Sequence, residues 1–295
     1  MAEYFRARNM PVPPELQRTL LTDWRRWLTI GVTLAILYVG LRITDIDASR
    51  ANPEYVAQIL GQLLTPNWDV LFPQVDLLFC ELPPDQCPRQ NFWDAGLGLM
   101  IITIFMAVVA TAVAVIVAVP LSVLGARNVM TGNPLTAAVY AVVRVAFTVI
   151  RSIDILILAV VAVVLFSIGN AAGVFAIAFH NIGVMGKLYS EAIEGIDAGP
   201  IEAITATGAN RFQVIWTAVL PQIVNPFISL TIYRLDTNVR LAPVLGLMGA
   251  GGIGVLLFQN MQLLHYHESG AIIFVIVVTV AVMDFLSAQV RRRLA

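Results

Sequence analysis

Residues 191–221 read EAIEGIDAGPIEAITATGANRFQVIWTAVLP, a polar stretch within a chain that is otherwise strongly apolar. Pro200 fits the first turn of a helix, where the N–H that proline lacks would have no partner. Gly208 can end that helix in a left-handed conformation, and Asn210 can cap a second helix. Pro221 is expected to break or kink the chain before the next apolar run. This stretch therefore predicts two short helices joined by a corner.

The apolar residues of this stretch repeat at helical spacing. Ile201 and Ile204 fall on one face of the first predicted helix, and Glu202 falls on another. The second predicted helix has its apolar positions at Phe212, Ile215, Trp216 and Val219. A compact helix–corner–helix of this kind has a shape that another protein can bind.

The composition points to a membrane. The 295-residue chain is 58% hydrophobic and 13% charged, and its mean hydropathy is +0.81, whereas soluble domains carry about 25% charged residues. Several apolar runs approach or exceed the roughly 18 residues that suggest a membrane-spanning helix. We therefore expect an all-α, multi-pass integral protein of the cell membrane with one membrane domain.

Charged residues are distributed unevenly along the chain. Arginines gather before the first apolar run and after the last one (Arg6, Arg8, Arg18, Arg25, Arg26, Arg291, Arg292 and Arg293). Acids dominate residues 44–96 (Asp45, Asp47, Glu54, Asp69, Asp76, Glu81, Asp85 and Asp94). Because positive charge favours the cytoplasmic side, both termini are expected inside and residues 44–96 outside. The first apolar run starts late and no small-residue cleavage site follows it, so a cleaved signal peptide is not expected.

These signals predict a cytoplasmic arm at 1–26, a first span at 27–43, an extracytoplasmic segment at 44–96 and a core domain at 97–295. Within the core, 137–150 is expected to lie near the cytoplasmic interface, where Arg144 and Arg151 reach water or lipid phosphate. The glycine-rich residues 245–258 are expected to bend or re-enter. The other predicted spans are 97–124, 155–168, 174–188, a run beginning at 222–235, and 271–289. Six crossings in all place residues 189–221 in the cytoplasm.

Part of the polar stretch resembles a known motif. Glu202-Ala203, then Gly208, then Leu220-Pro221 are similar in type and spacing to the cytoplasmic coupling (EAA) loop of ABC importer permeases. Two positions depart mildly from the motif, because Ile204 stands where Ala is usual and Ala218 where a larger aliphatic residue is usual. The resemblance implies the type I ABC importer permease fold, with residues 191–221 as the segment that receives an ATP-hydrolysing subunit.

The second half also resembles a narrower group, the permeases of phosphonate, phosphite and phosphate importers. The matching pieces are RSIDILILA at 151–159, FAIAFHNIGVMGKLYSEAIEGID at 175–197 and YRLDTNVRLAPVLGLMGAGGIG at 233–254. In that family the last piece lines the substrate path, which implies such a role for Arg234, Asn238 and Arg240. Asp154 stands where the family usually has Pro, which leaves a kink at that point open.

The residues of this last piece carry ionisable groups into a predicted span. A charge at membrane depth costs on the order of 3 kcal/mol or more, so it usually lines water or pairs internally. On a helix, Arg234 and Asn238 share one face, while Asp236 and Arg240 share another and can form an ion pair. Arg234 is then the better candidate to line a pore and to bind oxyanion oxygens with its guanidinium fork. A purely structural salt-bridge cluster is the alternative.

The remaining sequence motifs are weaker indications of function. GAGGIG at 249–254 matches the dinucleotide fingerprint, but the strand and βα unit that this motif needs are missing. His265, His267 and Glu268 are too few for an expected metal site. His180 is either a packed polar residue or a path residue. The chain has no GxxxxGK[ST] motif, so no cofactor is expected on it, and ATP and Mg are expected on a partner ATPase.

Cys80 and Cys87 are the only cysteines, and both fall in the predicted extracytoplasmic segment. In an oxidising compartment they can pair as a disulfide across Pro83-Pro84. Two free thiols are the equal alternative, since loop strain cannot be judged from sequence.

The resulting hypothesis is a permease subunit, not an enzyme, that forms the path for phosphonate or a related phosphorus oxyanion. Its implied partners are a second copy of the chain, two ATP-binding subunits at the cytoplasmic face, an extracytoplasmic substrate-binding protein and membrane lipid, with no nucleic acid. An ion-coupled secondary transporter is the alternative, although the halves show no repeat and acids within the spans are few. A membrane-embedded hydrolase would need a nucleophile–base pair or a metal-ligand set, and neither is found. The sequence leaves open which oxyanion is carried.

Overall fold

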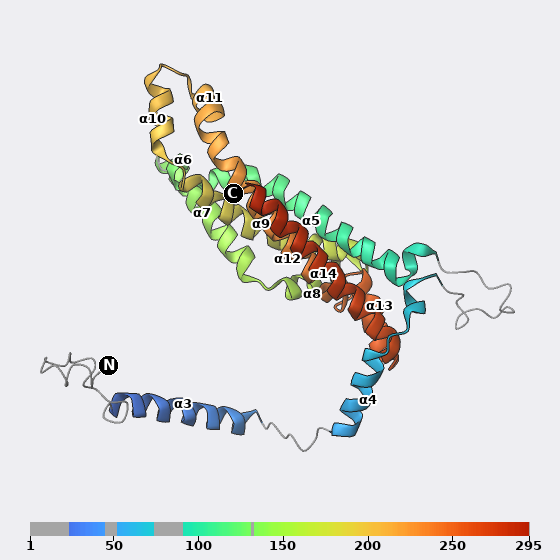
Figure 1. Ribbon diagram of the computed structural model, residues 1–295. Helices are drawn as coiled ribbons and strands as arrows, with labels where there is room; N and C mark the ends of the chain where they lie inside the picture. The colour runs from blue at the N-terminus through green and yellow to red at the C-terminus, as the bar shows by residue number, and fades with distance from the viewer. Residues whose placement is uncertain (1–23, 45–51, 74–90, 131–132, 295) are drawn as a thin grey trace, which may run out of the picture. The chain divides into compact units, whose positions relative to one another are not determined.

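The computed structural model describes residues 24–44, 52–73, 91–130 and 133–294. All secondary structure in these ranges is helical (Figure 1), which confirms the predicted all-α class. The chain divides into two units, Met1–Gln58 and Ile59–Ala295. Cys80 and Cys87 lie outside the described residues, so the question of their pairing stays as the sequence left it.

The first unit contains α3 (Trp24–Ile43) and the beginning of α4 (Pro53–Leu64). The side chains of α3 are exposed from Trp27 onward, and Trp27–Ile43 is apolar although it falls short of full membrane-spanning length. The first predicted span at 27–43 therefore coincides with a helix.

The second unit is a bundle around α9 (Asn170–Glu194), which packs against α5 (Gly96–Leu124), α7 (Pro134–Ser152), α8 (Ile155–Phe166) and α12 (Leu220–Gly246). Helices α13 (Ile253–Gln262) and α14 (Tyr266–Leu294) pack against α12 and α5. Short elements join them: η2 (Trp68–Leu71), η3 (Phe92–Asp94), α6 (Arg127–Met130), α10 (Ala198–Ala206), α11 (Arg211–Val214) and a π turn (Ile215–Val219).

Five described helices are long and apolar enough to cross a membrane: Gly96–Leu124, Pro134–Ser152, Asn170–Glu194, Phe212–Gly246 and Tyr266–Arg293. Four of the predicted spans lie within these helices, namely 97–124, 174–188, the run beginning at 222–235, and 271–289. Pro134–Ser152 also qualifies, although residues 137–150 were expected to lie near the interface.

Helices α7 and α8 meet at a break. Helix α7 ends at Ser152, and the Asp154 side chain accepts a hydrogen bond from the Leu156 N–H (2.8 Å) as it caps α8. A capping carboxylate satisfies a backbone donor that a new helix would leave unpaired. The chain therefore bends here without the proline that the resembling family usually has.

Small residues let the helices approach closely. Alanines and glycines occupy the contacts between α5, α8, α9 and α12, including the buried Ala107, Ala110, Ala159, Ala172 and Ala242. Small residues at contacts of this kind permit dense backbone packing in membrane helices. The core of the bundle is consequently alanine-rich.

The glycine-rich residues form a tight turn between α12 and α13. Gly249, Gly251 and Gly252 have φ values of +85°, +84° and +70°, in the left-handed region that favours glycine. A Cβ on Gly254 would collide with the Pro243 carbonyl oxygen. The GAGGIG pattern therefore serves helix packing, and the described residues contain no strand of the kind a dinucleotide fold requires.

The start of α14 is tied to the segment after α4. The His267 ring nitrogen Nδ1 lies 2.7 Å from the Thr65 carbonyl oxygen, and Asn67 donates from its side chain to Glu268 (3.3 Å). The rings of Trp68 and Phe274 meet edge to face. His267 and Glu268, weighed above as metal ligands, are thus hydrogen-bonding partners in a packing contact.

We expect Gly186→Val to destabilise the bundle by about 1–3 kcal/mol, the usual cost of overpacking. Its Cβ would collide with the Phe147 ring, and Phe147 is itself buried between α7 and α9. Thermal unfolding of the purified chain in detergent measures the effect. Gly195→Ala is the matched control, because its Cβ would meet its nearest neighbour at 3.4 Å; equal unfolding temperatures for both variants would contradict this packing.

Candidate functional site

The polar stretch folds as an arm that projects from one end of the bundle (Figure 1). We define the arm as residues 198–219, which comprise α10, the corner, α11 and the π turn. Asp197 caps α10 by accepting from the Gly199 N–H (3.0 Å). Gly208 at the corner has φ +80°, which confirms the predicted left-handed helix end.

The second helix of the arm begins with a reciprocal cap. The Asn210 side chain accepts from the Gln213 N–H (2.9 Å), and the Gln213 side chain accepts from the Asn210 N–H (2.8 Å). This capping box satisfies two backbone donors at once. The prediction that Asn210 caps the second helix is confirmed.

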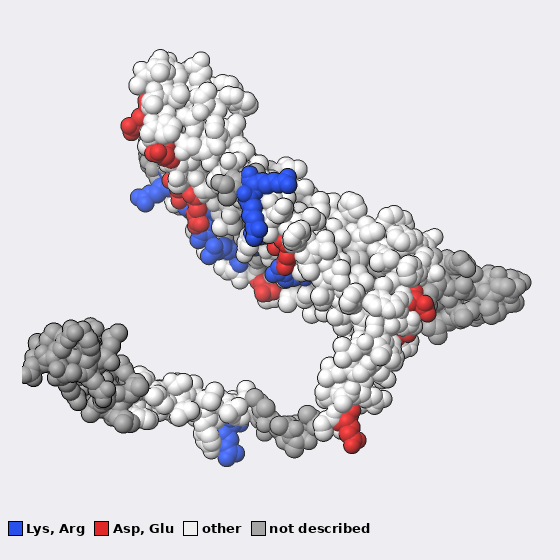
Figure 2. Space-filling model, in the orientation of Figure 1, with Lys and Arg blue, Asp and Glu red and all other residues white. Residues whose placement is uncertain are grey.

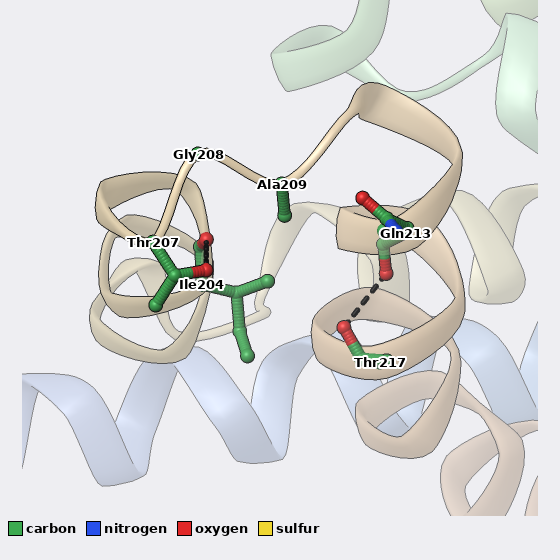
Figure 3. Close-up of a pocket in the computed structure, with 6 residues that line it drawn as sticks. All are labelled: Ile204, Thr207, Gly208, Ala209, Gln213 and Thr217. Carbon is green, nitrogen blue, oxygen red and sulfur yellow. Dashed lines mark hydrogen bonds between the residues drawn. The ribbon is translucent and has the colours of Figure 1, made fainter.

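The arm encloses an open cleft of about 450 Å³ between α10 and α11 (Figure 3). It is lined by Ile204, Thr207, Gly208, Ala209, Gln213 and Thr217. The Thr207 hydroxyl donates to the Ile204 carbonyl and the Thr217 hydroxyl to the Gln213 carbonyl, both at 2.7 Å. Both hydroxyl hydrogens are therefore engaged in holding their own helices.

Of the two predicted outcomes at Pro221, a break is excluded, and a kink stays a prediction. The helix continues from α11 through the π turn into α12, with Pro221 in the first turn of α12. The Leu220 N–H bonds to the Ile215 carbonyl, five residues back. A widened π turn of this kind relieves the clash between a proline ring and the carbonyl four residues earlier.

The surface of the arm is open. Glu202, Ala203 and Gly208 are exposed, while Phe212 and Trp216 stack on one another and remain 73% and 64% exposed. On the face shown in Figure 2 the arm is largely uncharged, with acidic side chains along one edge. Such a surface is available to a partner without rearrangement of the bundle.

An ion-pair network that the sequence reasoning missed lies at the base of the arm. Arg144 of α7 donates to both carboxylate oxygens of Glu194 on α9, each at 2.7 Å. Glu194 also accepts from the Arg127 N–H (2.7 Å). Arg144 thus pairs within the bundle while its side chain stays partly exposed, and Arg151 is exposed; that both reach water or lipid phosphate stays a prediction. An antiparallel register between α7 and α9 brings this pair together, and spacing along one helix cannot reveal it.

We expect Glu194→Gln to destabilise the chain by about 1–3 kcal/mol, since it removes the closer of the two carboxylates that pair with Arg144 and leaves only Glu191 at 3.9 Å. The Arg144 and Glu194 side chains are 20% and 26% exposed, so the loss should stay below that of a fully buried pair. Thermal unfolding of Glu194→Gln, Arg144→Gln and the double variant forms a double-mutant cycle. Additive losses would show that the two side chains are not coupled.

The path candidate Arg234 reaches α9. Its Nε and Nη2 donate to the Asn181 Oδ1 at 3.2 and 2.8 Å. Within the described ranges, none of the carboxylates forms a salt bridge with Arg234. Asn181 and Arg234 lie far apart along the chain, so the sequence alone gives no sign that they are in contact.

The other path candidates contact different helices. Asn238 is fully buried and donates to the Thr111 hydroxyl on α5 (2.8 Å), so it does not share the surroundings of Arg234. Arg240 pairs with Asp284 on α14 at 2.6 Å, and with Asp236 only at 3.9 Å. The predicted pair is present, but the closer partner comes from another helix.

The contacts along α12 also give the direction of α14. Arg240 meets Asp284, and Arg291 lies over the ring of Tyr233 at 5.7 Å. The two helices are therefore antiparallel, and the C-terminal arginines of α14 point toward the arm end of the bundle. Basic residues of several helices gather at this end (Arg127, Arg144, Lys187, Arg291, Arg292 and Arg293).

The described residues thus form a bundle with five helices of membrane-spanning length and a projecting two-helix arm. The family described as "Binding-protein-dependent transport system inner membrane component" matches residues 118–295. The chain belongs to this family.

Several relatives are similar over much of the chain. The "Phosphate-import permease protein PhnE" of Mycolicibacterium smegmatis is 33% identical over 290 residues, which are 90% of this chain and 52% of that protein. The chain thus spans about half the length of that relative. The "Phosphite transport system permease protein PtxC" of Stutzerimonas stutzeri is 37% identical over 220 residues, covering 75% of this chain and 78% of that protein.

Solved structures share the fold. The inward-facing MetNI methionine ABC transporter has a chain with a TM-score of 0.56 and 23% identity, which covers 66% of this chain and 94% of that one. An amino acid ABC transporter gives a TM-score of 0.56 at 15% identity, over 67% of this chain and 93% of that one. The predicted type I ABC importer permease fold is confirmed.

Proposed function

We propose that this chain is the permease subunit of an ABC importer and forms the path for a phosphorus oxyanion, namely phosphonate, phosphite or phosphate. The names of the relatives support this substrate class. The observation that carries the proposal is the Arg234 guanidinium, which lies half-buried in the bundle with an amide as its recorded partner. A guanidinium in this situation attracts a mobile anion and binds its oxygens through parallel N–H donors.

The roles of the other path candidates follow from their partners. Asp236 and Arg240 hold α12 against α14 through Asp284. These ion pairs keep the charged segment of α12 in a fixed position beside the path. Asn238 fixes α12 against α5. In this proposal Arg234 contacts the anion, while the other three residues set its position and the local charge.

The arm is the docking site for a partner ATPase, which would hold ATP and Mg. Glu202, Ala203 and Gly208 face outward for this contact, and Leu220 and Pro221 join the arm to α12. Because the helix is continuous through the π turn, a displacement of the arm is passed directly to the helix that carries Arg234. Rigid-body movement of this kind can alternate the opening of the path between the two sides.

We place the arm and both termini in the cytoplasm, with six crossings and residues 44–96 outside. The gathering of basic residues at the arm end supports this orientation. The assembly would contain two copies of this chain, two ATP-binding subunits and an extracytoplasmic binding protein. A two-fold axis would then present an Arg234 from each copy to one path.

Uptake by proteoliposomes that contain the whole assembly tests this function. With the binding protein outside and ATP enclosed, we expect accumulation of radiolabelled phosphate that methylphosphonate or phosphite suppresses by competition for the binding protein. Uptake should stop when ATP is replaced by a non-hydrolysable analogue. Uptake that follows an imposed ion gradient without ATP would instead favour a secondary transporter.

A further inference from the structure

Two neighbouring residues of α9 have unsatisfied polar atoms beside Arg234. Asn181 is fully buried, its oxygen is used by Arg234, and its Nδ2 has no hydrogen-bond partner within the described part of the chain. The His180 ring, which is partly buried, lies close to Arg234 and Asp154 and interacts with the Ile153 backbone, while its Nδ1 has no hydrogen-bond partner among the described residues. The Asn181 Nδ2 is a buried donor without a partner, which costs about 1–3 kcal/mol, so this arrangement favours a ligand that can accept hydrogen bonds. The His180 Nδ1 donates as well when the imidazole ring carries a proton on that nitrogen.

The donors are held in a rigid frame. Tyr189, also on α9, hydrogen-bonds to Thr231 of α12 (2.6 Å) and stacks on Phe227. This contact fixes the register of the two helices one or two turns away from the Asn181–Arg234 pair. A site whose supporting contacts lock its geometry binds its ligand with little cost of reorganisation.

The guanidinium of Arg234 gives this cluster a positive charge. The two hydrogen bonds from Arg234 to Asn181 share a single acceptor oxygen, and a guanidinium carries five N–H donors. An acid that acts on His180 is Asp154, whose carboxylate accepts from the Leu156 N–H as the cap of α8. The complement of this cluster is a small anion with several acceptor oxygens.

We propose that Arg234, Asn181 and His180 form an oxyanion-binding site inside the bundle, beside the break between α7 and α8, where the transported anion pauses. The inference rests on the proposed function and adds α9 to the path. Asn181 acts twice in this site: its oxygen orients the guanidinium, and its Nδ2 donates to the anion.

Asn181→Asp tests the site sharply, because it keeps the shape of the side chain but gives Arg234 a permanent carboxylate partner and removes the free donor. We expect uptake by the complete assembly to fall at least about tenfold, which corresponds to the loss of one charge-assisted hydrogen bond. Assembly and unfolding temperature should be retained or raised. If Asn181 only supported the helix packing, the new ion pair would preserve transport, so uptake equal to wild type would overturn the site.

Asn91→Asp is the matched control, since it adds the same charge at an exposed position outside the membrane-length helices and should transport as wild type. If Asn181→Asp does not assemble, His180→Phe decides the question because it keeps an aromatic ring and removes both nitrogens. A several-fold increase in the KM for the oxyanion supports the site, and an unchanged KM overturns it. A wild-type assembly that imports none of the three oxyanions would overturn the proposed function itself, whereas normal wild-type uptake with unaffected Asn181→Asp and His180→Phe would overturn only the site.

Discussion

Arg234→Gln is expected to lower oxyanion uptake about a hundredfold. The substitution removes a fixed positive charge and the paired N–H donors, and two hydrogen bonds to a charged group together contribute about 3 kcal/mol. Glutamine can still hydrogen-bond to Asn181, so the α9–α12 contact and the assembly should survive. Initial rates of radiolabelled phosphate uptake, compared at equal amounts of assembled complex, measure the effect.

Two further variants separate charge from geometry at this position. Arg234→Lys keeps the charge but lacks the planar fork, and we expect uptake between those of Arg234→Gln and wild type. Arg292→Gln removes an exposed arginine near the end of α14 and should leave uptake unchanged. Wild-type uptake by Arg234→Gln would remove Arg234 from the mechanism.

Glu202→Arg is expected to abolish association with the partner ATPase. Glu202 is exposed on α10 and contributes no side-chain hydrogen bond to the fold within the described residues. Charge reversal therefore leaves the arm folded, while a like charge or an unpaired charge at an interface costs several kcal/mol. Co-purification of the ATPase through an affinity tag on this chain measures the loss.

Asp94→Arg is the control for Glu202→Arg, because it reverses an exposed acid outside the arm and should retain the ATPase. The unfolding temperature of both variants should match that of the wild type. Full recovery of the ATPase with Glu202→Arg would show that this part of the arm does not bind it.

The local features of the arm were predictable because each depends on a few adjacent residues. Pro200 in the first turn, the left-handed Gly208 and the Asn210 cap all appear where the sequence placed them. At Pro221 the sequence left a break or a kink open, and the helix continues there through a π turn, so the chain is not broken. At Asp154 the sequence left a kink open, and a side-chain cap produces the break there.

The contacts between helices could not be predicted in the same way. Arg144–Glu194, Arg234–Asn181 and Arg240–Asp284 each join residues on different helices. Their meeting depends on the register and rotation of two packed helices, which a single sequence does not specify. The sequence identified Arg234 and Arg240 as candidates for the substrate path. It did not identify Asn181 and Asp284, to which these arginines bind.

We propose that the arm lies on the cytoplasmic side of the membrane, where an ATPase on another polypeptide can bind it. Thr205→Cys places a single reactive thiol on the exposed surface of α10 in a chain whose Cys80 and Cys87 have been replaced by serine, and a membrane-impermeant maleimide reports its side. We predict labelling in inside-out vesicles and none in intact cells, with Asn91→Cys in the proposed extracytoplasmic segment giving the opposite pattern. Labelling of Thr205→Cys in intact cells would contradict the account.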